Sequence, residues 1–174
     1  MDIEGLEPYD EFVVLIPASH ESRTDVPYLS ALNHASDGYV WYMPVTTEPA
    51  YALGVDIWGY PKVVADITHE DHGSVRETTV TVDGEHFATL AVDRPPAMHV
   101  EDDGFWYTRK DGDLLRIEPG FDADLGVWPL SSAVSLDLGE HAKADPLRDL
   151  GLGERALARV SAEGTVHLEP GEPV

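Results

Sequence analysis

The sequence is dominated by short runs of β-branched and aromatic residues, separated by turns rich in glycine, proline and aspartate. The runs that predict strands cover residues 11–16, 39–45, 75–82, 86–92, 105–110, 114–118, 127–138 and 165–168. Such side chains favour strands because they pack well on a pleated surface. Only residues 145–152 indicate a helix, and Gly151 interrupts it. The chain is therefore expected to be mainly β, with few short helices.

Two of the turns indicate β-hairpins. Asp83-Gly84 joins two predicted strands and is typical of a type I′ turn, in which both central residues take positive φ. Asp111-Gly112-Asp113 joins a second pair of strands in the same way. Many short strands with frequent turns predict a closed barrel or a sandwich. No linker or repeat divides the sequence, so we expect a single domain spanning residues 1–174.

The charge balance is strongly acidic. The chain has 33 aspartate and glutamate residues against 11 lysine and arginine residues, which gives a formal net charge of −22. Nucleic acids and anionic membrane surfaces would repel such a chain, so neither is an expected partner. The acids are spread along the sequence, which favours a halophilic protein whose self-repulsion is screened by salt. The alternative is an ordinary acidic cytosolic protein.

The sequence also predicts a cytoplasmic protein without metal. The N-terminus lacks the basic region of a signal peptide, and the apolar run 12–18 is far shorter than the ~20 residues of a membrane helix. The absence of cysteine excludes disulfides and thiolate ligands. His69-Glu70-Asp71-His72 has metal-binding residue types but lacks further ligands at convincing spacing. We expect it to be a solvated loop between two strands.

Lys62 has the clearest potential for chemistry. It stands in an apolar run, after Trp58, Gly59, Tyr60 and Pro61 and before two valines. Pro61 fixes its own φ and restricts Tyr60, so the lysine leaves the backbone from a stiff segment. The neighbouring side chains are expected to keep water away from its amine.

A lysine needs such surroundings to act as a nucleophile. Its ordinary pKa of ~10.4 keeps it protonated at neutral pH, and desolvation can lower a lysine pKa by up to ~3–5 units. A neutral amine can attack a ketone and give an iminium, which then accepts an electron pair. The alternative is an exposed Lys62 whose stem lies on the neighbouring tryptophan.

The segment from Asp37 to Lys62, DGYVWYMPVTTEPAYALGVDIWGYPK, resembles the core of the acetoacetate decarboxylase family. That family carries a strand, then Asn/Thr-Glu-Pro-Ala, Gly-Arg-Glu and Tyr/Phe-Pro-Lys, whose lysine forms the Schiff base. Residues 141–157 resemble its closing segment. The resemblance implies a closed antiparallel β-barrel. It also implies a lyase that releases CO2 from a β-keto acid through Lys62, with no metal or organic cofactor.

The resemblance assigns further site residues. Glu21 lies in a segment that matches an active-site glutamate, which makes it the favoured acid–base carboxylate. Glu11 is the nearest counterpart of a second family glutamate. Arg23 is a candidate binder of the substrate carboxylate. Trp58 and Tyr60 are candidate substrate-binding residues.

Departures from the family pattern leave the exact reaction open. Val63 replaces the second lysine of the family's usual pair, and Gly54-Val55-Asp56 replaces Gly-Arg-Glu. The family's N-terminal segment, which carries another arginine, has no counterpart. The alternatives are an aldolase or dehydratase acting on another keto acid, or a non-catalytic small-molecule-binding barrel in which Lys62 pairs with a carboxylate. The family's large assemblies imply a homo-oligomer.

Overall fold

The chain forms a strand-rich α+β fold in a computed structural model, which describes residues 7–18, 37–96, 98–103, 105–131, 133–152 and 156–174. The strands are β1 (Val14–Pro17), β2 (Gly38–Val45), β3 (Lys62–Val64), β4 (Asp66–His72), β5 (Val75–Val82), β6 (Glu85–Asp93), β7 (Met98–Asp103), β8 (Trp106–Lys110), β9 (Asp113–Ile117), β10 (Pro119–Ser131), β11 (Val134–Leu138), β12 (Ala156–Leu168) and β13 (Glu172–Pro173). The helical elements are α2 (Glu48–Leu53), the π-helix η1 (Gly54–Trp58), the 3₁₀-helix η2 (Ala142–Ala144) and α3 (Asp145–Asp149).

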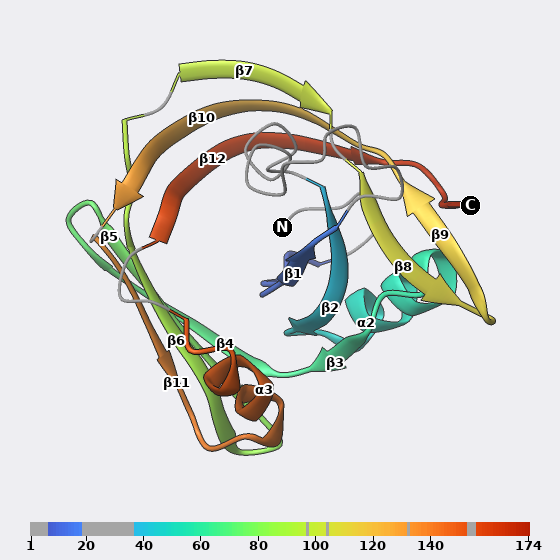
Figure 1. The fold of residues 1–174 in the computed structure, drawn as a ribbon, viewed down its shortest axis with the longest axis horizontal. Coiled ribbons are helices and arrows are strands. Elements are labelled where there is room, and N and C mark those ends of the chain that lie inside the picture. Colours follow the sequence, from blue (N-terminus) through green and yellow to red (C-terminus); the bar gives the residue numbers. More distant parts are fainter. Residues whose placement is uncertain (1–6, 19–36, 97, 104, 132, 153–155) are drawn as a thin grey trace.

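The strands form three separate sheets (Figure 1). The first has the order β1-β2-β8-β9-β13, with β3 added to β2, the second is β12-β10-β7, and the third is β11-β6-β5-β4. The prediction of a closed antiparallel β-barrel is wrong, because none of these sheets closes on itself within the described residues. The central strand β2 also pairs in parallel with both β3 and β8. A parallel pair needs a crossover, and α2 and η1 supply the one between β2 and β3.

The two predicted hairpins and the predicted C-terminal helix agree with the structure. Both hairpins are confirmed, joining β5 to β6 and β8 to β9. Asp83 and Gly84 have φ values of 52° and 81°, and Asp111 and Gly112 have values of 52° and 96°. These positive angles are those a type I′ turn requires. The helix predicted over residues 145–152 is confirmed as the shorter α3.

Three local predictions are wrong. Residues 127–138 do not form one strand, since β10 ends at Ser131 and β11 begins at Val134. The segment 69–72 is part of strand β4 rather than a loop, and His69 there pairs in register with Thr78 of β5. The C-terminal helix is not the only one, because α2 and η1 follow β2.

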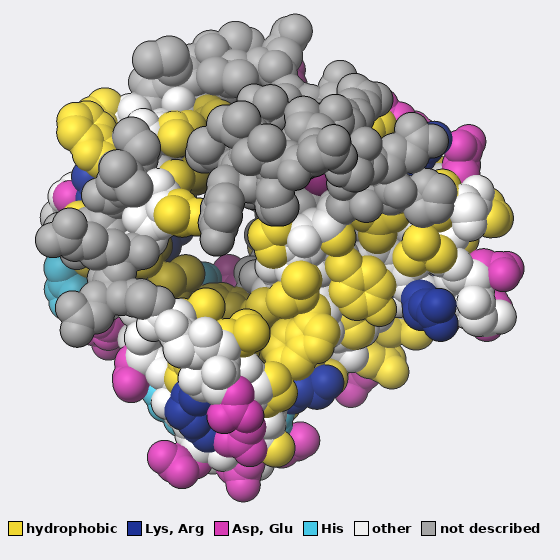
Figure 2. Space-filling view, in the orientation of Figure 1, with side chains coloured by type: hydrophobic (Ala, Val, Ile, Leu, Met, Phe, Trp, Pro, Cys, Tyr) yellow, Lys and Arg dark blue, Asp and Glu magenta, His cyan; other side chains and the backbone are white. Residues whose placement is uncertain are grey.

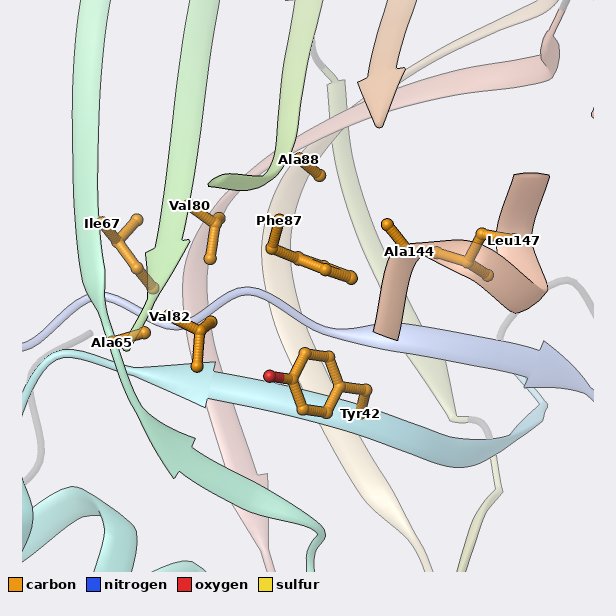
Figure 3. Close-up of a cluster of buried hydrophobic side chains, with 9 residues drawn as sticks. All are labelled: Tyr42, Ala65, Ile67, Val80, Val82, Phe87, Ala88, Ala144 and Leu147. Atoms are coloured by element: carbon orange, nitrogen blue, oxygen red, sulfur yellow. The ribbon is translucent and has the colours of Figure 1, made fainter. Parts of the chain in front are cut away.

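One hydrophobic core, the Phe87 cluster, lies where β2 and the β4–β6 strands meet the C-terminal helical segment (Figure 3). Its buried members are Tyr42, Ala65, Ile67, Val80, Val82, Phe87, Ala88, Ala144 and Leu147. The Phe87 ring lies edge-on to the Tyr42 ring, with their centroids 5.1 Å apart, an arrangement that aromatic pairs favour. Through Leu147, this cluster fixes α3 against the sheet.

The second core, the Met43 cluster, occupies the other face of β2. Its buried members are Tyr9, Val40, Met43, Val45, Ala50, Trp58, Tyr60 and Ile117. Successive side chains of a strand point to opposite faces, so Tyr42 joins the first cluster and Met43 the second. Val40 also joins the second cluster because the β1–β2 register shifts between Val40 and Tyr42. The central strand therefore separates two cores, and Lys62 lies beside the second one, directly opposite Met43 in the β2–β3 register.

The surface has a hydrophobic region and an acidic one. Figure 2 shows hydrophobic side chains gathered over the middle of one face, with acidic side chains around its edge. Within the described part of the chain, no helix combines the length and the apolar character that crossing a membrane requires.

Candidate active site

The centre of the site is built across β2 by residues from its two neighbouring segments. Glu11 forms an isolated antiparallel bridge with Val45, and Lys62 of β3 pairs with Met43. Val45 and Met43 are two positions apart on one strand, so they share a face, and residues paired in register share it too. Glu11 and Lys62 are thereby brought to the same side of the sheet, above two fully buried side chains.

Lys62 and Glu11 form a direct, largely buried ion pair. The Lys62 Nζ donates to the Glu11 Oε2 at 2.7 Å, and the two side chains are 4% and 11% exposed. The ammonium also lies 5.5 Å from the centre of the Tyr9 ring, within the range of a cation–π interaction. The sequence-based expectation that Lys62 is shielded from water is confirmed, and the alternative of an exposed lysine is wrong.

The helical crossover gives the lysine its space. Thr47 begins α2 by accepting a hydrogen bond from the Ala50 amide through its side-chain oxygen, and the helix continues into η1. Gly54, at the junction, faces the lysine side chain. A Cβ added to Gly54 would lie 2.9 Å from the Lys62 Nζ and closer still to its last two carbons. The observed lysine position therefore requires glycine at position 54.

The segment that leads into Lys62 is fixed by contacts with β8 and with the C-terminal region. Gly59 ends η1 with a φ of 66°, and a Cβ there would lie 2.8 Å from the Arg109 carbonyl oxygen. The Thr108 hydroxyl donates to the Gly59 carbonyl oxygen at 2.8 Å. The Trp58 Nε1 donates to the Glu169 carbonyl oxygen at 2.9 Å. These contacts hold the platform of the lysine in one position.

Two tyrosines beside the ion pair remain protonated over a wide pH range. Burial, together with the charge of Glu11, raises the pKa of Tyr9 to about 12. Burial is also the main cause that raises the pKa of Tyr60, followed by the charges of Glu11 and Tyr9. Both phenols can therefore act as hydrogen-bond donors at neutral pH.

Some of the predicted site residues lie close together in the structure, and others lie outside the described residues. Lys62 and Glu11 are in contact, and Trp58 and Tyr60 belong to the adjacent Met43 cluster. The predicted Glu21 and Arg23 lie outside the described residues.

Sequence reasoning missed Tyr9 and Gly54. Tyr9 stands two positions before Glu11, a spacing that places both side chains on one face of an extended segment. Gly54 had a weaker signal, as a glycine within a segment of helix-forming residues. No group of three or more potential metal ligands occurs among the residues whose placement is described.

Solved structures with the same fold are acetoacetate decarboxylases and related enzymes. An acetoacetate decarboxylase from Legionella pneumophila matches with a TM-score of 0.66 and 18% identity over 98% of this chain and 68% of its own. An acetoacetate decarboxylase-like enzyme from Sphingomonas wittichii matches with a TM-score of 0.64 and 14% identity over 95% of this chain and 69% of its own. The enduracididine biosynthesis enzyme MppR, solved with pyruvate, has a TM-score of 0.60 and 14% identity over 95% of this chain and 66% of its own.

The sequence profile of the acetoacetate decarboxylase family matches residues 1–174, and the chain belongs to that family. The chain spans 62–69% of the length of the solved relatives. No curated protein matches the sequence.

Proposed function

We propose that the protein is a lyase that forms a Schiff base between Lys62 and a small β-keto acid and releases CO2. The observation that carries the proposal is the buried Lys62 amine, 4% exposed and 2.7 Å from the carboxylate of Glu11. Family membership supports the same chemistry, as do relatives described as acetoacetate decarboxylases and a neighbour solved with pyruvate. The substrate class is therefore a short-chain keto acid.

The first step is the release of the amine. A free amine can form by proton transfer along the existing hydrogen bond between the Lys62 Nζ and the Glu11 Oε2. Transfer from Nζ to Glu11 gives a neutral amine and a neutral carboxylic acid. A neutral pair is less costly than two charges in apolar surroundings once a substrate displaces the remaining water. Glu11 is thus the general base, with Glu21 as the alternative proton carrier.

The amine lone pair then adds to the keto carbon, and loss of water gives an iminium. The bond to the carboxylate breaks, and its electron pair moves to the iminium as CO2 leaves, which gives an enamine. A proton delivered to the enamine carbon and hydrolysis of the iminium release the ketone and restore Lys62. Protein side chains and water supply every group in this sequence.

Reductive trapping tests the proposal. Acetoacetate or pyruvate is added with borohydride, and peptide mass analysis locates the adduct among the three lysines Lys62, Lys110 and Lys143. We expect the adduct on Lys62 alone, and a loss of at least 90% of it in Lys62→Met. The other two lysines are internal controls in the same molecule. Equal labelling of all three, or an undiminished adduct in Lys62→Met, would contradict the proposal.

An aldol-type reaction through the same iminium is a second candidate. It is favoured by the structural neighbour MppR, which was also solved with the condensation product of pyruvate and an aldehyde. Release of CO2 from acetoacetate separates the two reactions, since only decarboxylation produces it. Adduct formation without CO2 would favour the aldol-type reaction.

A binding protein without turnover is the candidate from another class. It is favoured by the Lys62–Glu11 pair itself, because a stable ion pair needs no chemistry to explain it. In that case a keto acid would bind without forming any borohydride-stable adduct. Titration calorimetry alongside trapping distinguishes this protein from the proposed enzyme.

A further inference from the structure

The hydroxyl group of Tyr60 is buried and has no hydrogen-bond partner among the described residues. Among the described residues, the buried side-chain atoms without a partner belong to Tyr60 and Arg159. Arg159 has its charge compensated, since its Nη1 lies 2.8 Å from the Asp93 Oδ2. Tyr60 is only 4% exposed, and no described residue forms a hydrogen bond or ion pair with its hydroxyl. An unpaired buried donor costs about 1–3 kcal/mol, so its presence needs an explanation.

Tyr60 is joined to Lys62 through a tight turn. The Lys62 amide donates to the Tyr60 carbonyl oxygen at 2.8 Å, which closes a three-residue turn around Pro61. The Tyr60 amide in turn donates to the carbonyl oxygen of Gly54, the residue that faces the lysine side chain. The phenol and the amine therefore extend from the two ends of one fixed turn.

Both groups also border the same carboxylate. Glu11 lies 2.7 Å from the Lys62 Nζ, and its charge is one of the causes that raise the pKa of Tyr60. The phenol consequently keeps its proton while Glu11 is charged. It is a neutral donor within electrostatic range of Glu11, and it has no partner among the described residues.

The Tyr60 ring has little freedom to turn towards another partner. It stacks on Trp58 with their ring centroids 5.7 Å apart and an angle of 23° between the planes. Trp106 packs against it edge-on, with ring centroids 6.4 Å apart. A donor held in this way is oriented before any ligand arrives, which is the arrangement that stabilises developing charge most effectively.

We propose that the Tyr60 hydroxyl donates a hydrogen bond to the carbonyl oxygen of the keto acid that condenses with Lys62. The inference rests on the function proposed above. As the amine forms its bond to the carbon, the carbonyl π electrons move to this oxygen, and the hydrogen bond stabilises the growing negative charge. Tyr60 keeps its own proton throughout, and the oxygen takes one proton from the added amine and one from the protonated Glu11 before it leaves as water. A carboxylic acid without the keto group would leave the donor unpaired and be rejected.

The test compares Tyr60→Phe with the wild-type protein, using Tyr42→Phe as the matched control. Tyr42 is also buried but belongs to the Phe87 cluster on the other face of β2. The Lys62 adduct is trapped with borohydride over a range of pyruvate concentrations, and each protein is melted by circular dichroism. We expect half-maximal trapping in Tyr60→Phe to need about tenfold more pyruvate, as loss of one hydrogen bond predicts. Its melting temperature should be unchanged or higher, because the change removes an unpaired buried hydroxyl.

The outcomes separate this inference from the function on which it rests. Equal half-maximal concentrations in wild type and Tyr60→Phe, with adduct on Lys62 in both, overturn the role of Tyr60 alone. A lower melting temperature with unchanged trapping also overturns it, because the hydroxyl would then have a structural role. No adduct in the wild-type protein overturns the Schiff-base function, and this inference with it. An equal weakening in Tyr42→Phe would show that any buried hydroxyl has the same effect, and would likewise overturn it.

Discussion

The two cores on either side of β2 differ in the polar groups that they contain or border. The Phe87 cluster is closed around aliphatic and aromatic contacts, with Phe87 itself fully buried. The Met43 cluster contains two tyrosines and a tryptophan and borders the buried Lys62–Glu11 pair. One face of the strand is therefore packed mainly by apolar and aromatic side chains. The other face combines packing with a buried charge and unused hydrogen-bonding capacity, which is typical of a functional site.

The largest expected effect on stability is that of Phe87→Ala. Removing a buried phenylalanine and leaving a cavity typically costs about 3–5 kcal/mol. We expect a loss of this size in the free energy of unfolding, measured by urea denaturation. At temperatures where the variant is folded, trapping at Lys62 should be unchanged.

Met43→Ala is the matched variant on the other face, since Met43 is also fully buried but pairs with Lys62. This variant should have a lower free energy of unfolding and should also form less of the borohydride-trapped adduct at Lys62. If Phe87→Ala impaired trapping as strongly as Met43→Ala does, the division between the two faces would not hold.

Gly54→Ala should have a smaller effect on stability and a large effect on chemistry. Gly54 has helical φ and ψ values of −68° and −38°, so alanine suits the backbone there. The new methyl group would collide with the flexible Lys62 side chain, which has to move away from Glu11. The helix propensity of alanine would stabilise the variant by about 1 kcal/mol, whereas breaking the buried Lys62–Glu11 pair costs about 3–5 kcal/mol. We therefore expect a net loss of about 2–4 kcal/mol in the free energy of unfolding, with trapping at Lys62 reduced at least tenfold.

Ala52→Gly, in the preceding helix, is the control for a change in helix propensity, because Ala52 is exposed. It should lower stability slightly and leave trapping intact. Normal trapping in Gly54→Ala would mean that the lysine does not need the space beside the crossover.

The smallest expected effect on the free energy of unfolding comes from the buried tyrosines, and it arises only at alkaline pH. Burial, followed by the charge of Asp83, raises the pKa of Tyr42 to about 12, and burial with Glu11 does the same for Tyr9. A raised pKa means that the folded state holds the proton more tightly than the unfolded chain. The stability from each tyrosine is therefore complete below pH ~10 and is lost as the pH rises towards 12.

Tyr42→Phe should accordingly reduce the slope of stability against pH above pH 10, without a corresponding change at pH 7. Denaturation with urea at several pH values measures this slope. An unchanged alkaline slope in Tyr42→Phe would contradict the assignment of that loss to Tyr42.

Local signals in the sequence predict the two hairpins and the burial of Lys62. Asp83-Gly84 specifies its turn because few other residue pairs accept two positive φ angles. Trp58 and Tyr60, which precede Lys62, are themselves buried, so their side chains in the sequence already indicate that the lysine is shielded from water. The closed barrel was predicted wrongly because closure depends on which distant strands pair, and no short pattern encodes the parallel pairing of β2 with β3 and β8.

The contact between Lys62 and Glu11 could be predicted only in part. Glu11 was named from a family resemblance, whereas its bridge to Val45 is a long-range contact that no local pattern reveals. The helix before Lys62 had a usable signal, since Thr47 precedes Glu48 and Pro49, which suits a helix N-terminus. Its brevity, and its continuation as a π-helix through Gly54 and Asp56, obscured the helical pattern.

The ion pair joins residues 51 positions apart, and β2 lies between them. No hairpin or single helix can assemble this contact, because it needs a long chain loop to close first. In the nascent chain the amine is hydrated and protonated, so it is inert towards the carbonyl metabolites around it. If Lys62 reacts as proposed, its covalent reactivity depends on this long-range contact, and carbonyl trapping during refolding would show when the contact forms.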